Sequence, residues 1–212
     1  IRSVISEVDN IRIDISSFNT IYNAYPGDFD QASIYWDAIN SESGSGRTAG
    51  AIADGNGNGQ IEFRNNAGVF ENYRAWQHLN LAEITKIEYF GERVSGTPEA
   101  GVDIPRAKIG GGYILNYGAL NITDENVLLL GTAKNITTTT NIPLGPILSA
   151  FDAHKIESKI DDGIPTSGNV RGDDDGTPGA CAGSSDECCT NNDLYNLTTD
   201  EKTCMMGFTI TN

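Results

Sequence analysis

The stretch of sequence that decides the fold is residues 1–27, IRSVISEVDNIRIDISSFNTIYNAYPG. Its apolar side chains recur at steps of three and four residues. They are Ile1, Val4, Ile5, Val8, Ile11, Ile15, Phe18, Tyr22 and Tyr25. This spacing places them on one face of a helix of about seven turns, and Pro26-Gly27 is expected to end that helix. Because one apolar face needs a partner, residues 1–25 predict a long helix that packs on the chain's own sheet, or partly on the sheet and partly on sister subunits.

More helices are expected further along the chain. Asp28 and Gln31 have the spacing of a capping box, which predicts a second helix with its apolar side chains at Phe29, Ala32, Tyr35, Trp36 and Ile39. Apolar periodicity predicts a third helix over about 66–84 and a fourth over about 143–159. His78 lies on the third helix and is interpreted as a packing or surface histidine.

Strands are expected in the second half of the chain. Short apolar runs between glycine-rich breaks indicate strands at 112–117 and 126–133, and 167–171 and 205–211 are candidate closing strands. Helices followed by strands predict an α+β fold with an antiparallel sheet, additional helices and long loops. We expect one domain over residues 1–212, because no repeat or domain boundary is visible.

Composition excludes several classes of protein. The 212 residues carry a net charge of −15, so the surface repels nucleic acid and anionic lipid headgroups. At 38% hydrophobic residues the chain is too apolar for a disordered protein. Twenty-four glycines and only 20% charged residues are typical of a loop-rich extracellular protein.

All four cysteines lie in one segment, residues 181–204: Cys181, Cys188, Cys189 and Cys204. An even number in a short segment favours local disulfides in an oxidising compartment. A bond between the adjacent Cys188 and Cys189 is disfavoured by ring strain. Cys181 is therefore expected to pair with one of these two, and Cys204 with the other.

A candidate calcium site lies in residues 54–62, DGNGNGQIE. Asp54, Asn56 and Asn58 supply oxygen side chains at positions 1, 3 and 5 of a calcium loop, and Gly59 stands at position 6. Gln60 would contribute its backbone carbonyl. Position 12 is Asn65 rather than the bidentate glutamate, so Glu62 at position 9 is the expected substitute. The alternative is a glycine- and asparagine-rich turn that binds no ion.

A second acidic group comprises Asp161, Asp162 and residues 173–175, DDD. Consecutive aspartates chelate poorly unless a turn folds them together, so we interpret this group as a solvated surface. The sequence contains no nucleophile elbow, no HExxH zinc motif and no phosphate-binding loop. We therefore expect a protein that is not an enzyme, with a carboxylate-based hydrolase as a minor alternative.

Four sequence segments, taken in their order along the chain, resemble the bacterial type IV pilin-like family, which comprises the pilins and the type II secretion pseudopilins. Residues 18–28, FNTIYNAYPGD, look like the end of a pilin's first helix and the turn after it. Residues 54–62 look like a loop of one subgroup, and 70–79, FENYRAWQHL, are similar to that subgroup's next helix. Residues 159–168, KIDDGIPTSG, resemble its late turn from helix to strand.

The resemblance implies a pilin-like fold and a structural function. Residues 1–25 would be the second half of the family's long helix, and residues 181–204 would be its disulfide-bonded loop. The subunit-packing residues would be Ile1, Val4, Ile5, Val8, Ile11 and Ile15. Partners would be copies of the chain or other pilins in a helical filament, either on the cell surface or at the inner membrane facing the periplasm. The family's apolar first half is missing here, so we expect contact with a membrane only through such a segment, and a chain that is largely monomeric by itself.

A second hypothesis belongs to another class of protein. The chain could be a calcium-dependent module for cell adhesion that recognises a glycan or a protein. Such a module needs exposed aromatic side chains near the metal, and the candidates are Tyr35, Trp36 and Tyr73. Their helical spacing favours a role in the core instead.

Overall fold

The computed structural model describes residues 1–36, 52–63, 69–89, 91, 97–134, 144–173, 190–191, 194–198 and 200–210. The helices within these ranges are α1 (Arg2–Tyr22), α2 (Ala32–Tyr35), α3 (Glu71–Leu81), the 3-10 helix η1 (Ala119–Asn121) and α4 (Ala150–Ile160). The strands are β1 (Gly112–Tyr117), β2 (Asn126–Ala133), β3 (Leu144–Gly145), β4 (Leu148–Ser149), β5 (Val170–Asp173), β6 (Thr190–Asn191), β7 (Leu194–Tyr195) and β8 (Lys202–Thr209). The fold is α+β, as the order of patterns in the sequence predicts.

The main sheet is antiparallel and has β8 at its centre. Its strand order is β1-β2-β8-β4, while β3 pairs with β2 and β5 pairs with β8. In the register of the sheet, Leu128 of β2 and Val170 of β5 both face Phe208 of β8. A separate two-stranded sheet consists of β6 and β7. Since β8 pairs with strands on both of its edges, it joins the early strands to the late ones.

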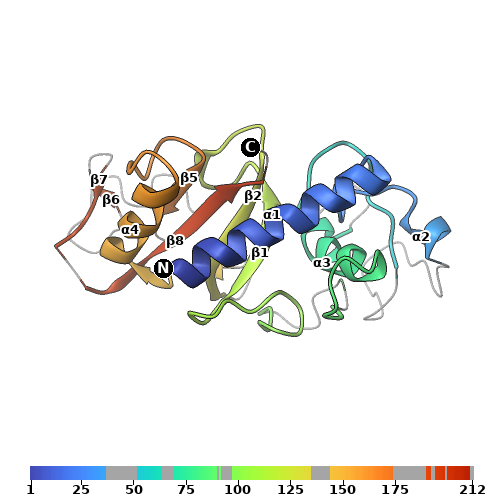
Figure 1. Ribbon diagram of the computed structural model, residues 1–212, viewed down its shortest axis with the longest axis horizontal. Helices are drawn as coiled ribbons and strands as arrows, with labels where there is room; N and C mark the ends of the chain where they lie inside the picture. Colours follow the sequence, from blue (N-terminus) through green and yellow to red (C-terminus); the bar gives the residue numbers. More distant parts are fainter. Residues whose placement is uncertain are drawn as a thin grey trace.

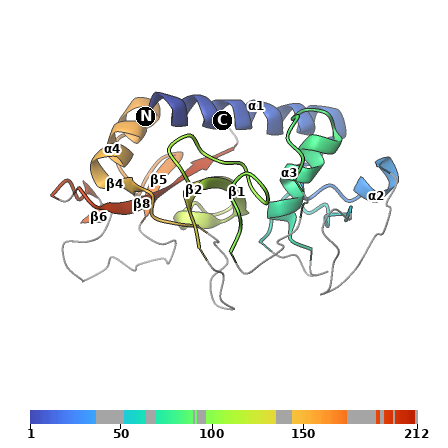
Figure 2. The same cartoon turned by 90° about the horizontal axis from the view of Figure 1, so that it is seen from below.

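Helix α1 lies lengthwise over one face of the main sheet (Figures 1 and 2). The start of the helix lies beside α4, and its end lies beside α3. Buried apolar side chains of α1, the strands, α3 and α4 form one continuous cluster, which includes Val8, Phe18, Leu128 and Ile156. The long amphipathic helix therefore covers the core of its own domain.

The end of α1 differs from the prediction. The helix ends at Tyr22 and not at Tyr25, because Asn23 adopts a left-handed conformation with φ of 52°. Its backbone N–H donates to the carbonyl of Asn19, which closes the last turn. Asparagine is one of the few residues that tolerate this conformation, so it caps the helix before Pro26-Gly27 is reached.

The other helices are also shorter than expected, because each begins later in the chain. Asp28 is not the cap of a second helix, since α2 is a single turn that begins four residues later and Gln31 precedes it. Helix α3 begins at Glu71 rather than near residue 66. Helix α4 begins after Ser149, whose hydroxyl accepts a hydrogen bond from the Asp152 backbone N–H. The residues before it form β3 and β4, because they pair with β2 and β8.

Candidate functional site

The apolar face of α1 packs inside the chain. Val4, Val8 and Ile15 are buried in the core, while Ile1, Ile5 and Ile11 are partly buried against it. This corrects the assignment of Val4, Val8 and Ile15 to subunit packing, since these buried side chains cannot reach a second copy. Subunit packing by Ile1, Ile5 and Ile11 stays a prediction. The exposed large apolar side chains on this helix are Ile13 and Ile21, which are 61% and 62% exposed.

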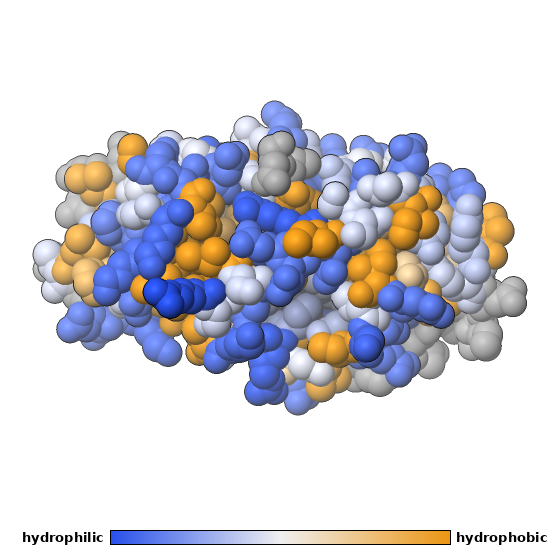
Figure 3. Space-filling view, in the orientation of Figure 1, coloured by the Kyte–Doolittle hydropathy of each residue, from blue (hydrophilic) through white to orange (hydrophobic). Residues whose placement is uncertain are grey.

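The surface around α1 is mixed in character. Figure 3 shows apolar patches that are scattered among polar side chains on this face rather than joined in one continuous stripe. A partner that covers this face would therefore contact polar groups as well as apolar side chains such as Ile13 and Ile21.

The loop at residues 54–62 is organised around a buried carboxylate, Asp28. The backbone N–H groups of Asn58 and Gly59 donate to its two oxygens, at 3.0 and 2.8 Å. Burial raises the pKa of Asp28 to about 6, although these backbone donors act in the opposite direction. Asp28 therefore fixes the tip of the loop.

The structure brings together some of the predicted calcium ligands. The side-chain amides of Asn56 and Asn58 both donate to Glu62 Oε2, at 2.7 and 3.2 Å. The Gln60 backbone N–H donates to Asn58 Oδ1. Asp54 has a different role, because its carboxylate accepts hydrogen bonds from the backbone N–H and the hydroxyl of Ser33. Calcium binding by Asp54, Asn56, Asn58, Gln60 and Glu62 stays a prediction.

Glu71 is a further anchor of this loop that the sequence did not reveal. Its side chain is fully buried at the first turn of α3, and its two oxygens accept from the backbone N–H groups of Asn56 and Glu62. An acidic residue in the first turn of a helix is ordinary, so only the three-dimensional contacts identify its role.

The described residues contain one cluster of three carboxylates that can hold a metal ion: Glu157, Asp161 and Asp162. One oxygen from each side chain lies within 4.8 Å of the others. Glu157 belongs to the last turns of α4, Asp161 follows the helix, and Asp162 begins the turn toward β5. The end of α4 thus gathers three acidic groups in one place.

The three carboxylates differ in their surroundings. Asp161 Oδ2 accepts from the backbone N–H groups of Asn169 and Val170. Asp162 accepts from the Ile164 backbone N–H and the Ser167 hydroxyl, and these bonds lower its pKa. Burial, followed by the neighbouring carboxyls of Asp162 and Asp161, raises the pKa of Glu157 to about 8.

The sequence did not indicate that Asp161 and Asp162 form a cluster with Glu157. Glu157 and Asp161 have the i, i+4 spacing that brings two side chains together on a helix, and like charges at that spacing are unfavourable. That spacing was the available signal. The interpretation of Asp161 and Asp162 as a solvated surface agrees with the exposure of Asp162, whereas Asp161 is only partly exposed and accepts two backbone hydrogen bonds.

One of the predicted disulfide cysteines is described. Cys204 is buried in β8 and is disulfide-bonded. Cys181, Cys188 and Cys189 lie outside the described residues, so the pairing stays a prediction. Asp174 and Asp175 also lie outside them, while Asp173 ends β5.

Comparison with known proteins gives no relative. No protein-family model, no curated protein and no solved structure matches this chain. Within the described part of the chain, no helix combines the length and the apolar character needed to cross a membrane.

Proposed function

We propose that the chain is a structural subunit of a type IV pilus or of a type II secretion filament. The observation that carries the proposal is the position of α1, which starts over the antiparallel sheet and continues over α3, with one apolar face buried (Figure 2). The four segments that resemble pilin-like proteins, at residues 18–28, 54–62, 70–79 and 159–168, support the same family. A subunit of this kind acts by packing, and its chemistry is that of interfaces rather than of catalysis.

In this proposal, α1 has two separate roles. Its inner face, with Val8 and Ile15, anchors the helix to the sheet. Its outer face, with Ile13 and Ile21, is available for neighbouring subunits. Burial of two such side chains against a neighbour contributes about 3–6 kcal/mol at most, so assembly would need further contacts.

Crosslinking in cells tests the proposal. The variants Ile13→Cys and Ile21→Cys, introduced into the full-length protein in its own cells, are expected to give crosslinked dimers in fibres sheared from the surface. Ile15→Cys is the matched control, since its side chain is buried and cannot reach a second copy. Absence of the chain from sheared fibres and from secretion complexes would reject the filament function.

One observation favours the adhesin as a second candidate. Tyr35 is 60% exposed and lies in the short α2, whose Ser33 is hydrogen-bonded to Asp54 in the candidate calcium loop. Tyr73, in contrast, is fully buried and cannot contact a ligand. A glycan array probed with the wild-type chain and with Tyr35→Ala, in the presence of calcium, tests this candidate. Binding that depends on Tyr35 would support it, and an array without binding would reject it.

A further inference from the structure

Outside the loop of residues 54–62, the buried polar group that most needs a partner is the carboxyl group of Glu157. Its side chain is 0% exposed, and neither of its oxygens has a hydrogen-bond partner. A buried carboxylate without a partner is costly, because nothing replaces the water that it lost on folding. The structure therefore leaves a buried carboxyl group without a hydrogen-bond partner at the end of α4, beside Asp161 and Asp162.

A second buried polar group points to the same place. Tyr195 of β7 is 7% exposed, and its hydroxyl has no hydrogen-bond partner. Strand β7 packs against α4, and burial followed by the neighbouring Glu157 raises the pKa of Tyr195. The ring packs against β5, where a Cβ on Gly172 would lie only 2.8 Å from the Tyr195 Oη. Tyr195 thus brings a neutral oxygen to the cluster from a different part of the chain.

The positive charge near the cluster is already engaged. Arg12 of α1 is close enough to Asp161 to interact with it electrostatically. Its Nε donates a 2.9 Å hydrogen bond to the Thr209 carbonyl, however, so the guanidinium is held by β8. Arg12, which is shared between Thr209 and Asp161, therefore leaves room for a cation beside Asp161 and Asp162.

We propose that Glu157, Asp161 and Asp162, with the hydroxyl of Tyr195, form a binding site for a hard divalent cation, with calcium as the best match. Carboxylate and water oxygens are ligands that calcium takes in flexible numbers and geometry, and the neutral Tyr195 hydroxyl would add a further oxygen at the edge of the site. Both Glu157 oxygens are free for the ion. Asp162 is exposed, so water can complete the coordination shell from that side.

The hydrogen bonds of the two aspartates prepare them for this role. Asp161 Oδ2 already accepts two backbone donors, which leaves Oδ1 for the ion. Each oxygen of Asp162 accepts one donor and keeps a second lone pair. The bonds hold the turn before β5 in place, and a cation would then join that turn to α4 and to β7.

Thermal unfolding of the full chain tests the proposal, with calcium added after treatment with a chelator. The melting temperature of the wild type is expected to rise by about 5–10 °C at a calcium concentration about 100-fold above the Kd. The variants Glu157→Gln and Asp162→Asn are expected to lose this rise. Glu157→Gln replaces a buried carboxyl group that has no hydrogen-bond partner, so without calcium it should melt no lower than the wild type.

Two control variants separate this site from other acidic groups. Glu88→Gln changes one exposed carboxylate and matches the change in net charge. Glu62→Gln removes the only acidic side chain besides Asp54 from the predicted ligands at residues 54–62. Both are expected to keep the calcium-dependent rise that Glu157→Gln and Asp162→Asn lose.

Three outcomes would overturn the proposal. The first is an unchanged melting temperature of the wild type in millimolar calcium. The second is a full calcium response in both Glu157→Gln and Asp162→Asn, which would place the ion elsewhere. If Glu62→Gln then lost the calcium response, the ion would lie at residues 54–62. The third is a response to zinc but not to calcium, which would contradict the assignment to hard oxygen ligands. None of these outcomes bears on the filament function, which rests on α1.

Discussion

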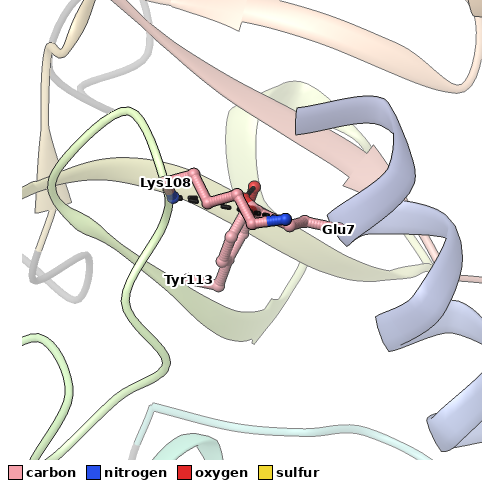
Figure 4. A network of polar contacts seen from close by, with 3 residues as sticks. All are labelled: Glu7, Lys108 and Tyr113. Carbon is pink, nitrogen blue, oxygen red and sulfur yellow. Dashed lines mark hydrogen bonds and ion pairs between the residues drawn. The ribbon is translucent and has the colours of Figure 1, made fainter. Parts of the chain in front are cut away.

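Tyr113 in β1 donates a hydrogen bond of 2.8 Å to Glu7 in α1, across 106 residues of sequence (Figure 4). Lys108, in the segment before β1, approaches the same carboxylate through its backbone N–H and, at 3.8 Å, through its ammonium. The Tyr113 ring is buried, so this bond is a shielded polar contact between α1 and the sheet near the start of the helix.

Replacing Tyr113 by Phe should destabilise the protein by about 1.5–3 kcal/mol, because a hydrogen bond to a charged group is lost while the ring stays in place. Urea denaturation of both proteins measures the change. Lys108→Ala is the matched control and should cost less than about 1 kcal/mol, since the Lys108 side chain is 72% exposed. Equal losses in the two variants would mean that the ion pair, and not the tyrosine, holds the helix.

The two faces of α1 should respond differently to truncation. Ile15→Ala opens a cavity in the core and should cost about 2–5 kcal/mol of unfolding free energy. Ile13→Ala, two residues earlier on the exposed side, should change it by less than about 0.5 kcal/mol. Denaturation of the isolated chain measures both. A large loss for Ile13→Ala would show that α1 packs through the opposite face.

His78 should make stability depend on pH. It is fully buried on α3, where its Nδ1 accepts from the Gly27 backbone N–H, so the neutral ring carries its proton on Nε2 and directs it to the Ala53 carbonyl. Burial, then the charge of Arg74, lowers its pKa to about 3. The unfolded chain binds this proton near pH 6.5, so its contribution is complete above that pH and is lost progressively as the pH falls toward 3.

The expected loss from His78 alone is about 2 kcal/mol between pH 6.5 and pH 5. Denaturation of the wild type and of His78→Gln at pH 7.5, 6 and 5 isolates it, because other titrating groups are common to both proteins. The difference in stability between the two should shrink as the pH falls. A constant difference over this range would refute the buried neutral histidine.

Substitution by alanine should destabilise the protein far more at Gly27 than at Gly110. Both have a positive φ, at 88° and 97°. A Cβ on Gly27 would lie 2.2 Å from the carbonyl oxygen of Glu71, whereas a Cβ on Gly110 meets nothing within 4 Å. Gly110→Ala should therefore cost about 1–2 kcal/mol for the backbone conformation alone, and Gly27→Ala more than about 3 kcal/mol. Similar melting temperatures for the two variants would contradict the close contact between Gly27 and α3.

Local patterns predicted the regular elements of the fold well. The apolar runs at 112–117 and 126–133 coincide with β1 and β2, and the apolar spacing of residues 1–25 correctly predicted the helix α1. The exact end of the helix depended on the backbone conformation of Asn23, which no periodicity reports. The short strands β3 and β4 were expected to be helical, because they are defined by pairing with β2 and β8 rather than by their own residues.

The candidate site was harder to predict, because it depends on contacts between distant segments. Asp28 has the sequence context of a helix cap, yet its carboxylate is held by backbone groups of Asn58 and Gly59, about 30 residues away. Glu157 stands next to Ile156 on an ordinary amphipathic helix, and its burial follows only from the way α4 packs on β8. A sequence pattern shows which residues share a face of a helix, but it does not show which carboxylate becomes buried and loses its hydration on folding.

The central place of β8 has a consequence for how the chain acquires its structure. Arg12 donates to the carbonyl of Thr209, 197 residues later, and β8 separates β2 from β4 and β5. During synthesis, the ribosome must release residues 202–209 before the main sheet can close and cover the apolar face of α1. Until then that face has no sheet to bury it, so the apolar side chains of α1 stay exposed in the nascent chain.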